Sequence, residues 1–307
     1  MRICVVGCGA VGSLFAAHLA RAGEAEIWAY DVWKEHTAVI REKGLRLSGA
    51  SDFVAQLNAT SNPQEIPPCD FGLVATKATH TRSAIQQTAH VFGVNSAVCS
   101  VQNGMGSEEI LAEHVKYVIR GTTFPAGHPI GPGHIGYDIK GDTWIGPFEP
   151  TNTPFRMVET LAGLMTRSGM NTIALQDARG AQWTKLIFNA STNPVGALTQ
   201  LHHGAATRFP ETGQLFEDLI AEGEAVARAL GIQLHGDPRN MVQKGANAPG
   251  KHRASMLQDV LAKRQTEVDF MNGAIVRWGE QAGVPTPLNR ALWQLVKGLE
   301  HSWTDPD

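Results

Sequence analysis

The chain lacks the features of a secreted, membrane-spanning or nucleic-acid-binding protein. Four cysteines occur among 307 residues, and no two of them form a C-x-x-C pair. No apolar run reaches the roughly 18 residues that a membrane-spanning helix needs. The net charge is −3 without any basic block, which argues against nucleic acid or an anionic membrane as partner. We expect free thiols, no signal peptide and a cytoplasmic location.

Two further absences exclude classes of enzyme. The sequence has no H-E-x-x-H motif and no Cys/His set at zinc spacing, so we expect no metal site. It also has no G-x-S-x-G elbow, which excludes a serine hydrolase. The length, with 43% hydrophobic and 18% charged residues, is typical of a globular protein with two domains.

A glycine-rich turn follows the first apolar strand and opens a helix. It consists of Gly7, Cys8, Gly9, Ala10, Val11 and Gly12, at G-x-G-x-x-G spacing. Gly7 permits a tight turn, Gly9 allows close approach of a pyrophosphate, and Gly12 lets the helix pack on the strand. The helix N-terminus adds unpaired N–H groups for phosphates. This context predicts a dinucleotide site; the alternative is a βα turn without a ligand.

Asp31 follows the second predicted strand, Glu26–Tyr30, about 20 residues past the glycines. A carboxylate there can accept hydrogen bonds from a ribose and would repel a 2′-phosphate, which favours NAD over NADP. Asp31 could also cap the predicted helix Trp33–Lys43. NADP remains open because Lys34 or Arg41 could reach a 2′-phosphate.

Strands and helices alternate through residues 1–177, which predicts a Rossmann domain with a doubly wound parallel sheet. Lys77 and Asn103 follow two of the strands, at the edge where such sheets bind ligands. Residues 178–307 predict an all-helical domain, with the substrate in the cleft between the domains.

Further strands are predicted at Leu45–Leu47, Phe53–Leu57, Phe71–Thr76, Ser96–Val101 and Asn171–Leu175, with a hairpin of His134–Ile139 and Thr143–Ile145. Helices are predicted at Ala78–Phe92, Glu108–Val115, Pro154–Ser168, Arg179–Leu198, Phe209–Leu230, Arg253–Ala282 and Asn289–Ser302, with a loop at Gly236–Gly250.

Lys185, Asn189 and Asn193 are spaced to share one face of a helix that is otherwise largely apolar. Asparagine is a mediocre helix former and gains nothing from burial without partners. The spacing therefore suggests a functional face, against the alternative of a solvated polar face. Pro194 should kink or end this helix because it has no N–H to donate.

A second polar set contains Ser255 and Glu267, twelve residues apart. The Ser255 hydroxyl could bind a carboxylate, and Glu267 could accept from a substrate hydroxyl. The alternative is an ordinary surface helix, which the spacing does not exclude.

Taken together, these motifs resemble the ketopantoate reductase family, over nearly the whole chain. The shared features are the glycine motif, Lys77, Gln102-Asn103-Gly104, Pro132-Gly133, Lys185-Leu186-x-x-Asn189-x-x-x-Asn193-Pro194, Ser255-Met256-x-x-Asp259, Thr266-Glu267, Asn272-Gly273 and Pro285-Thr286-Pro287.

The resemblance implies reduction of a 2-keto acid to a 2-hydroxy acid by hydride from a nicotinamide. By this resemblance Lys185 is the general acid, and Glu267 orients the substrate hydroxyl and supports the lysine. Ser255 matches a contact to the substrate carboxylate. The other matches are Asn103, which bridges cofactor and substrate, Lys77 near the nicotinamide, and the substrate amides Asn189 and Asn193.

Two positions depart from the family pattern. Trp33 stands where NADPH-dependent members usually carry arginine, which agrees with NAD. His252 replaces a substrate-binding asparagine, which leaves open another branched or aromatic substrate, as in D-mandelate dehydrogenases. A dinucleotide sensor without turnover is the alternative from another class, although it would not need both Lys185 and Glu267. The oligomeric state is open, a homodimer included.

Overall fold

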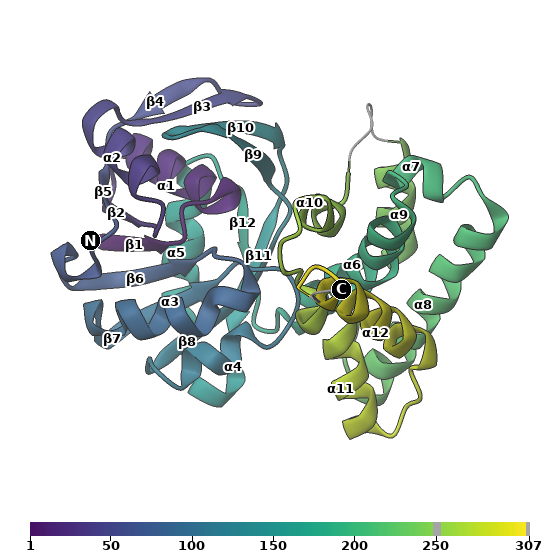
Figure 1. Cartoon of the computed structure of the whole chain (residues 1–307). Helices are drawn as coiled ribbons and strands as arrows, with labels where there is room; N and C mark the ends of the chain where they lie inside the picture. Colours follow the sequence, from purple (N-terminus) through teal and green to yellow (C-terminus); the bar gives the residue numbers. More distant parts are fainter. Residues whose placement is uncertain (248–252, 305–307) are drawn as a thin grey trace. The chain divides into compact units, whose positions relative to one another are not determined.

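The computed structural model describes residues 1–247 and 253–304, which form two compact units. The first unit contains Met1–Gln102 and Ser107–Ala178. The second contains the short segment Asn103–Gly106 and the chain from Arg179 onward (Figure 1). Each unit has its own apolar core.

The larger sheet of the first unit has eight strands in the described residues, in the order β12-β11-β8-β7-β6-β1-β2-β5. From β8 to β5 all neighbours are parallel, whereas β11 runs antiparallel to β8. This confirms the predicted Rossmann architecture. The strands are β1 (Arg2–Val6), β2 (Glu26–Tyr30), β5 (Asn58–Thr60), β6 (Cys69–Val74), β7 (Phe92–Ser100), β8 (Tyr117–Thr123), β11 (Thr143–Pro147) and β12 (Thr172–Ala174).

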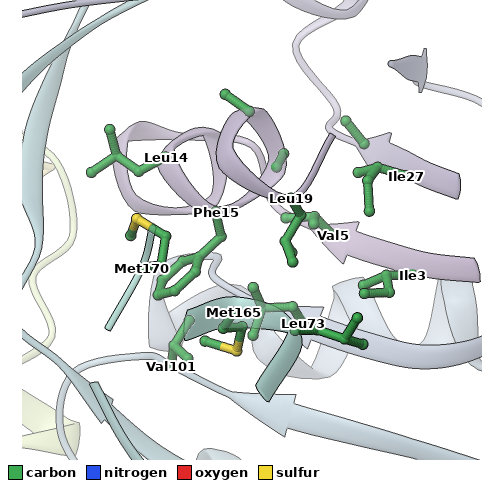
Figure 2. Packing of buried hydrophobic residues seen from close by; sticks show 14 of the residues in the cluster. Ile3, Val5, Leu14, Phe15, Leu19, Ile27, Leu73, Val101, Met165 and Met170 are labelled. Atoms are coloured by element: carbon green, nitrogen blue, oxygen red, sulfur yellow. The ribbon is translucent and has the colours of Figure 1, made fainter. Parts of the chain in front are cut away.

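Helices cover both faces of this sheet, and β1 is accordingly apolar and buried from Ile3 to Val6. Ile3 and Val5 point to one core, which they share with side chains of α1 and α5. Cys4 and Val6 point to the other, which they share with side chains of α3 and α4. Figure 2 shows Phe15 and Leu19 of α1 over the first of these faces. The helices of the unit are α1 (Ala10–Ala22), α2 (Lys34–Lys43), α3 (Thr81–Thr88), α4 (Ser107–Ala112) and α5 (Phe155–Arg167).

A second sheet of four strands packs on the other side of α1, so that this helix is buried between two sheets (Figure 1). Its order is β4-β3-β10-β9. The predicted hairpin of His134–Ile139 and Thr143–Ile145 is wrong. The first of these strands, β10, pairs with β9, whereas the second belongs to the large sheet. The four strands are β3 (Leu45–Gly49), β4 (Phe53–Ala55), β9 (Ala126–Gly131) and β10 (His134–Ile139).

The second unit is helical in the part that the structure describes, as predicted. Two details of the prediction are wrong. The expected loop Gly236–Gly250 contains a helix, α9, because Pro238 stands at its first position, where no N–H is needed. The expected helix Arg253–Ala282 is broken into α10, a 3₁₀ turn at Val268–Phe270, and α11. The helices are α6 (Arg179–Thr199), α7 (His203–Ala206), α8 (Pro210–Ala229), α9 (Pro238–Asn247), α10 (Ser255–Leu261), α11 (Asn272–Ala282) and α12 (Pro287–His301).

Of the two predicted effects of Pro194, a kink or an end of the helix, the end does not occur, because α6 continues to Thr199. A proline at this position cannot donate to the carbonyl oxygen of Ala190. The side chain of Asn272 replaces the missing donor, with Nδ2 2.9 Å from the Ala190 oxygen. Asn272 also donates to Asn289 Oδ1 at 3.0 Å, and Asn289 in turn donates to Glu222 at 2.8 Å. A buried polar network thus stabilises the helix around its proline.

In residues 1–247 and 253–304, no helix is long and apolar enough to cross a membrane.

Candidate active site

The glycine loop lies between β1 and α1 in the first unit. Gly7 has φ +89°, a conformation that other residues rarely adopt. A Cβ on Gly12 would lie 1.9 Å from the Gly7 oxygen, so this position admits no side chain. A Cβ on Gly9 would meet no atom within 4 Å, which leaves open space above the loop. Because Gly9 caps α1 without a side-chain bond, the free N–H groups of the helix face this space. The loop fits a pyrophosphate group.

The Asp31 carboxylate is built into this loop. It accepts from the backbone N–H of Cys8 at 2.7 Å and from that of Trp33 at 2.9 Å. The second bond closes a turn before α2, whose N-cap residue is Trp33 without a side-chain cap, so Asp31 does not occupy the N-cap position considered in the sequence. Each carboxylate oxygen has a further lone pair, so these bonds do not exclude a ribose contact. Asp31 thus ties the glycine loop to the start of α2.

Two residues that the sequence analysis did not select also support the loop. Ser13 Oγ donates to the Cys8 carbonyl at 2.8 Å. The buried His36 accepts from the Gly133 N–H at Nδ1 (2.9 Å), and its ring stacks on Trp33 with centroids 4.9 Å apart. Burial lowers the pKa of His36, which favours the neutral ring that this acceptor requires. The only sequence signal for Ser13 and His36 was that each is a polar residue on a helix face that is otherwise apolar.

Lys77 follows β6, the strand next to β1, as predicted. The polar residue at the end of β7 is Gln102, which is buried. Its Nε2 donates to the Thr76 carbonyl at 3.0 Å and to Thr81 Oγ1 at 2.8 Å. Gln102 therefore fixes the segment that carries Lys77.

The second unit brings Lys185 and Asn103 into direct contact. The Lys185 ammonium donates to Asn103 Oδ1 at 2.9 Å. Asn103 is followed by Gly104, with φ +84°, where a Cβ would lie 2.3 Å from the Phe270 oxygen. Met105 N–H donates to the same oxygen at 2.8 Å. The segment around Asn103 is thus fixed against the 3₁₀ turn that follows Glu267.

Glu267 is buried, with 4% of its surface exposed, and interacts electrostatically with Lys185. A polar network holds the residues beside it. The Thr266 N–H and hydroxyl both donate to Glu300 Oε1, at 2.8 and 2.6 Å. Lys297 bridges Glu300 and Asp269, at 2.9 and 3.0 Å. Bonds before and after Glu267 therefore fix the backbone on which it stands.

Lys185 has a pKa of about 8, below its ordinary value of 10.5. Burial disfavours the charged ammonium and lowers the pKa, whereas the Glu267 carboxylate favours the charge and limits the shift. The lysine is thus mostly protonated at neutral pH, yet a better proton donor than a solvated lysine.

Asn189 and Asn193 lie on α6 with Lys185, and each is only 7% exposed. Asn193 Nδ2 contacts the sulfur of Met271 at 3.5 Å, a weak acceptor. The Asn189 amide has no hydrogen-bond partner among the residues that the structure describes. This finding argues against a solvated polar face. Ser255 begins α10, which packs on α6 near Gly196.

His252, the departure noted in the sequence, lies outside the described residues. Within residues 1–247 and 253–304, no group of three or more His, Cys, Asp or Glu side chains is placed to hold a metal ion.

The glycine loop, and a partly buried lysine that interacts with a buried glutamate, are features of nicotinamide-dependent oxidoreductases. Comparison with known families defines the protein further. Residues 3–150 match the family model described as ketopantoate reductase PanE/ApbA, and residues 177–300 match that of its C-terminal domain. The chain belongs to the ketopantoate reductase family. It is an enzyme that reduces a 2-keto acid to a 2-hydroxy acid with a nicotinamide cofactor.

Individual relatives extend over the whole chain. The 2-dehydropantoate 2-reductase of Archaeoglobus fulgidus is 34% identical over 97% of this chain and 98% of its own length. A PanE/ApbA family ketopantoate reductase from Ralstonia eutropha JMP134 superposes with a TM-score of 0.87 at 30% identity, covering 99% and 100% of the two chains. D-mandelate dehydrogenase with NADH and anilino(oxo)acetate gives a TM-score of 0.89 at 25% identity, also covering 99% and 100%.

Proposed function

We propose that the protein reduces 2-dehydropantoate to pantoate, with Lys185 as general acid. The observation that carries this proposal is the contact of the partly buried Lys185 and Asn103 beside the buried Glu267 in one unit, with the lysine pKa close to 8. The curated relatives support the substrate, since that of Archaeoglobus fulgidus is a 2-dehydropantoate 2-reductase.

In this proposal the bound nicotinamide supplies a hydride to the keto carbon. Lys185 Nζ donates a proton to the keto oxygen as negative charge develops on it, and the neutral amine then regains a proton from solvent. Asn103 Oδ1 holds the ammonium in position through the 2.9 Å bond. Glu267 keeps the lysine charged at neutral pH and accepts a hydrogen bond from the substrate hydroxyl.

The amides of Asn189 and Asn193 are proposed to bind the polar groups of the substrate. Burying an amide without a strong partner is unfavourable, and a substrate carboxylate or hydroxyl would satisfy both side chains. Ser255 is proposed to donate its hydroxyl to the carboxylate. It stands in the first turn of α10, where helix N–H groups also favour an anion.

The glycine loop (Gly7, Cys8, Gly9, Ala10, Val11 and Gly12), Asp31, Lys77 and Asn103 are proposed to bind the cofactor, with a preference for NAD over NADP. Asp31 places a carboxylate beside the loop, and Trp33 stands in place of the arginine that would neutralise a 2′-phosphate. Arg41 is engaged elsewhere, because its Nε donates to the Ala59 carbonyl at 3.1 Å. Lys34 is exposed and is the nearest sequence candidate for NADP binding.

A second candidate substrate is a bulkier or aromatic 2-keto acid. The superposition on D-mandelate dehydrogenase favours it, although the sequence identity of 25% is below the 34% shared with the 2-dehydropantoate 2-reductase. We also keep the cytoplasm as the proposed location, since all four thiols are free and buried.

The test is oxidation of NADH and NADPH with 2-dehydropantoate, 2-ketoisovalerate and benzoylformate. We expect the highest kcat/KM with 2-dehydropantoate, and a loss of about 10²–10⁴-fold in kcat for Lys185→Met, because general acid catalysis is removed. Lys244→Met, an exposed lysine of α9, serves as the matched control and should be unaffected. Near-normal turnover of Lys185→Met would overturn the assignment of the acid, and preference for benzoylformate would overturn the substrate.

A further inference from the structure

A polar cavity of about 370 Å³ lies in the first unit, at the C-terminal end of α1. Its lining includes residues of α1, β10 and the C-terminal end of α5, and none of the lining residues is acidic. The glycine loop lies at the other end of the same 13-residue helix, about 18 Å away at 1.5 Å per residue. The cavity is therefore distinct from the proposed pyrophosphate site.

Three cationic side chains line this cavity: Arg21, Lys140 and Arg167. Arg167 pairs with the Glu24 carboxylate at 2.8 Å. Arg21 lies over the Phe53 ring, 4.4 Å from its centroid, and has no carboxylate partner among the described residues. Lys140 is exposed and forms no ion pair with any residue in the described part of the chain. With Glu24 included, the cavity has an excess of two formal positive charges.

The helix dipoles account for only part of this cluster. Arg21 and Arg167 each stand in the last turn of a helix, where a cation is favourable in any protein. Lys140 follows strand β10 and serves no helix end. Lys140 and Arg21 line the cavity together with His18. Burial lowers the pKa of the His18 ring, and the positive charge of each cation contributes to this lowering.

Two buried polar side chains of the lining lack a strong partner. His18 is 7% exposed; its Nδ1 lies 3.0 Å from the Ser168 carbonyl, and its Nε2 is buried without a hydrogen-bond partner. Tyr137 is 3% exposed, and its hydroxyl contacts only the sulfur of Met170, at 3.9 Å. Because Nδ1 faces a carbonyl, it carries the proton, and Nε2 is an acceptor. The protein covers this nitrogen, so recognition of a ligand falls to the three cations.

We propose that this cavity binds a small organic phosphate monoester. Its dianion matches the excess of two positive charges. The arginines present planar forks suited to phosphate oxygens. The volume falls in the range of sites for small organic molecules, about 300–1,000 Å³, and is larger than inorganic phosphate requires. The site is independent of the proposed function.

The experiment is calorimetric titration of glycerol 3-phosphate and 3-phosphoglycerate into the enzyme saturated with its nicotinamide cofactor, with inorganic phosphate for comparison. Saturation blocks the phosphate-binding positions of the cofactor. We expect one site, with about tenfold weaker binding for Arg21→Gln and for Lys140→Gln, since each removes a charge-assisted bond. Both residues are exposed, so the variants should fold. Arg156→Gln, an exposed arginine of the same α5 helix, is the control for net charge.

A second variant tests the opposite direction. Glu24→Gln frees Arg167 and should tighten binding, whereas Glu159→Gln, on the exposed face of α5, should not. The proposal would be overturned if neither organic phosphate binds. It would also be overturned if the double variant of Arg21 and Lys140 binds them as tightly as the wild type. If inorganic phosphate binds with the same affinity as the organic phosphates, the cavity does not recognise the organic part, and the proposal of an organic ligand is overturned. None of these results depends on turnover, so they are separate from the test of the reductase.

Discussion

The proline in α6 leads to a specific prediction about the helix that carries Lys185, the proposed general acid. The carbonyl of Ala190 has lost its helix donor to Pro194 and accepts from Asn272 Nδ2 at 2.9 Å instead. Asn272→Ala would leave this oxygen and Asn289 Oδ1 without their donor, at a cost of about 2–4 kcal/mol in the free energy of unfolding. In a Pro194→Ala background the helix N–H becomes available, so the same substitution should cost about 1–2 kcal/mol less.

The assay is urea unfolding of the wild type, the two single variants and the double variant. The difference between the two costs is the coupling energy of Asn272 with Pro194. Gln214→Ala is the control, because its hydrogen bond to Asp218 is exposed and unrelated to α6; its cost should be the same in both backgrounds. If Asn272→Ala costs the same with and without Pro194, the side chain does not replace the helix donor and the reasoning is refuted.

Three further predictions concern the cofactor loop and the support of Glu267. Gly12→Ala should destabilise the fold, because its Cβ would lie 1.9 Å from a backbone oxygen. Gly9→Ala should leave the stability unchanged and weaken NADH binding at least tenfold. Equal stability of the two variants would contradict the loop geometry. Glu300→Ala should lower kcat about tenfold in a folded protein by releasing the turn that carries Glu267, and unchanged kinetics would exclude this positioning role. Asp31→Ser with Trp33→Arg should shift preference from NADH to NADPH, since serine can still accept the hydrogen bond from the N–H of residue 33, and an unchanged ratio of kcat/KM values would remove the cofactor argument.

The sequence was most informative where local patterns determine structure. The alternation of strands and helices predicted β1, β2, β6 and β7 because these are largely apolar runs followed by a polar or glycine residue, whereas β5 and β8 of the same sheet were not predicted. The hairpin was wrong because the strand around Ile135 and the strand around Ile145 find their partners in different sheets, a tertiary choice that neither segment encodes.

The pattern of the proposed site residues is visible in the sequence, whereas the contacts that support them are not. Lys185 and the asparagines share a helical face by spacing alone, whereas Asn103 reaches the lysine because Gly104 fits against the Phe270 carbonyl, 166 residues further along the chain. The continuation of α6 past Pro194 could not be predicted, because the donor that replaces the missing N–H is also remote in sequence. Contacts over such separations depend on the packed fold and leave no local signal.

The central claim is that Lys185 delivers the proton, and the pH dependence of kcat/KM for keto acid reduction tests it most directly. The ammonium form is required, so the rate should fall as pH rises through about 8, the pKa of Lys185. Glu267→Gln removes the carboxylate that raises this pKa and should move the fall to lower pH. Lys185→Arg should abolish the fall, because a guanidinium stays protonated. A fall near pH 8 that persists in Lys185→Arg would contradict the account.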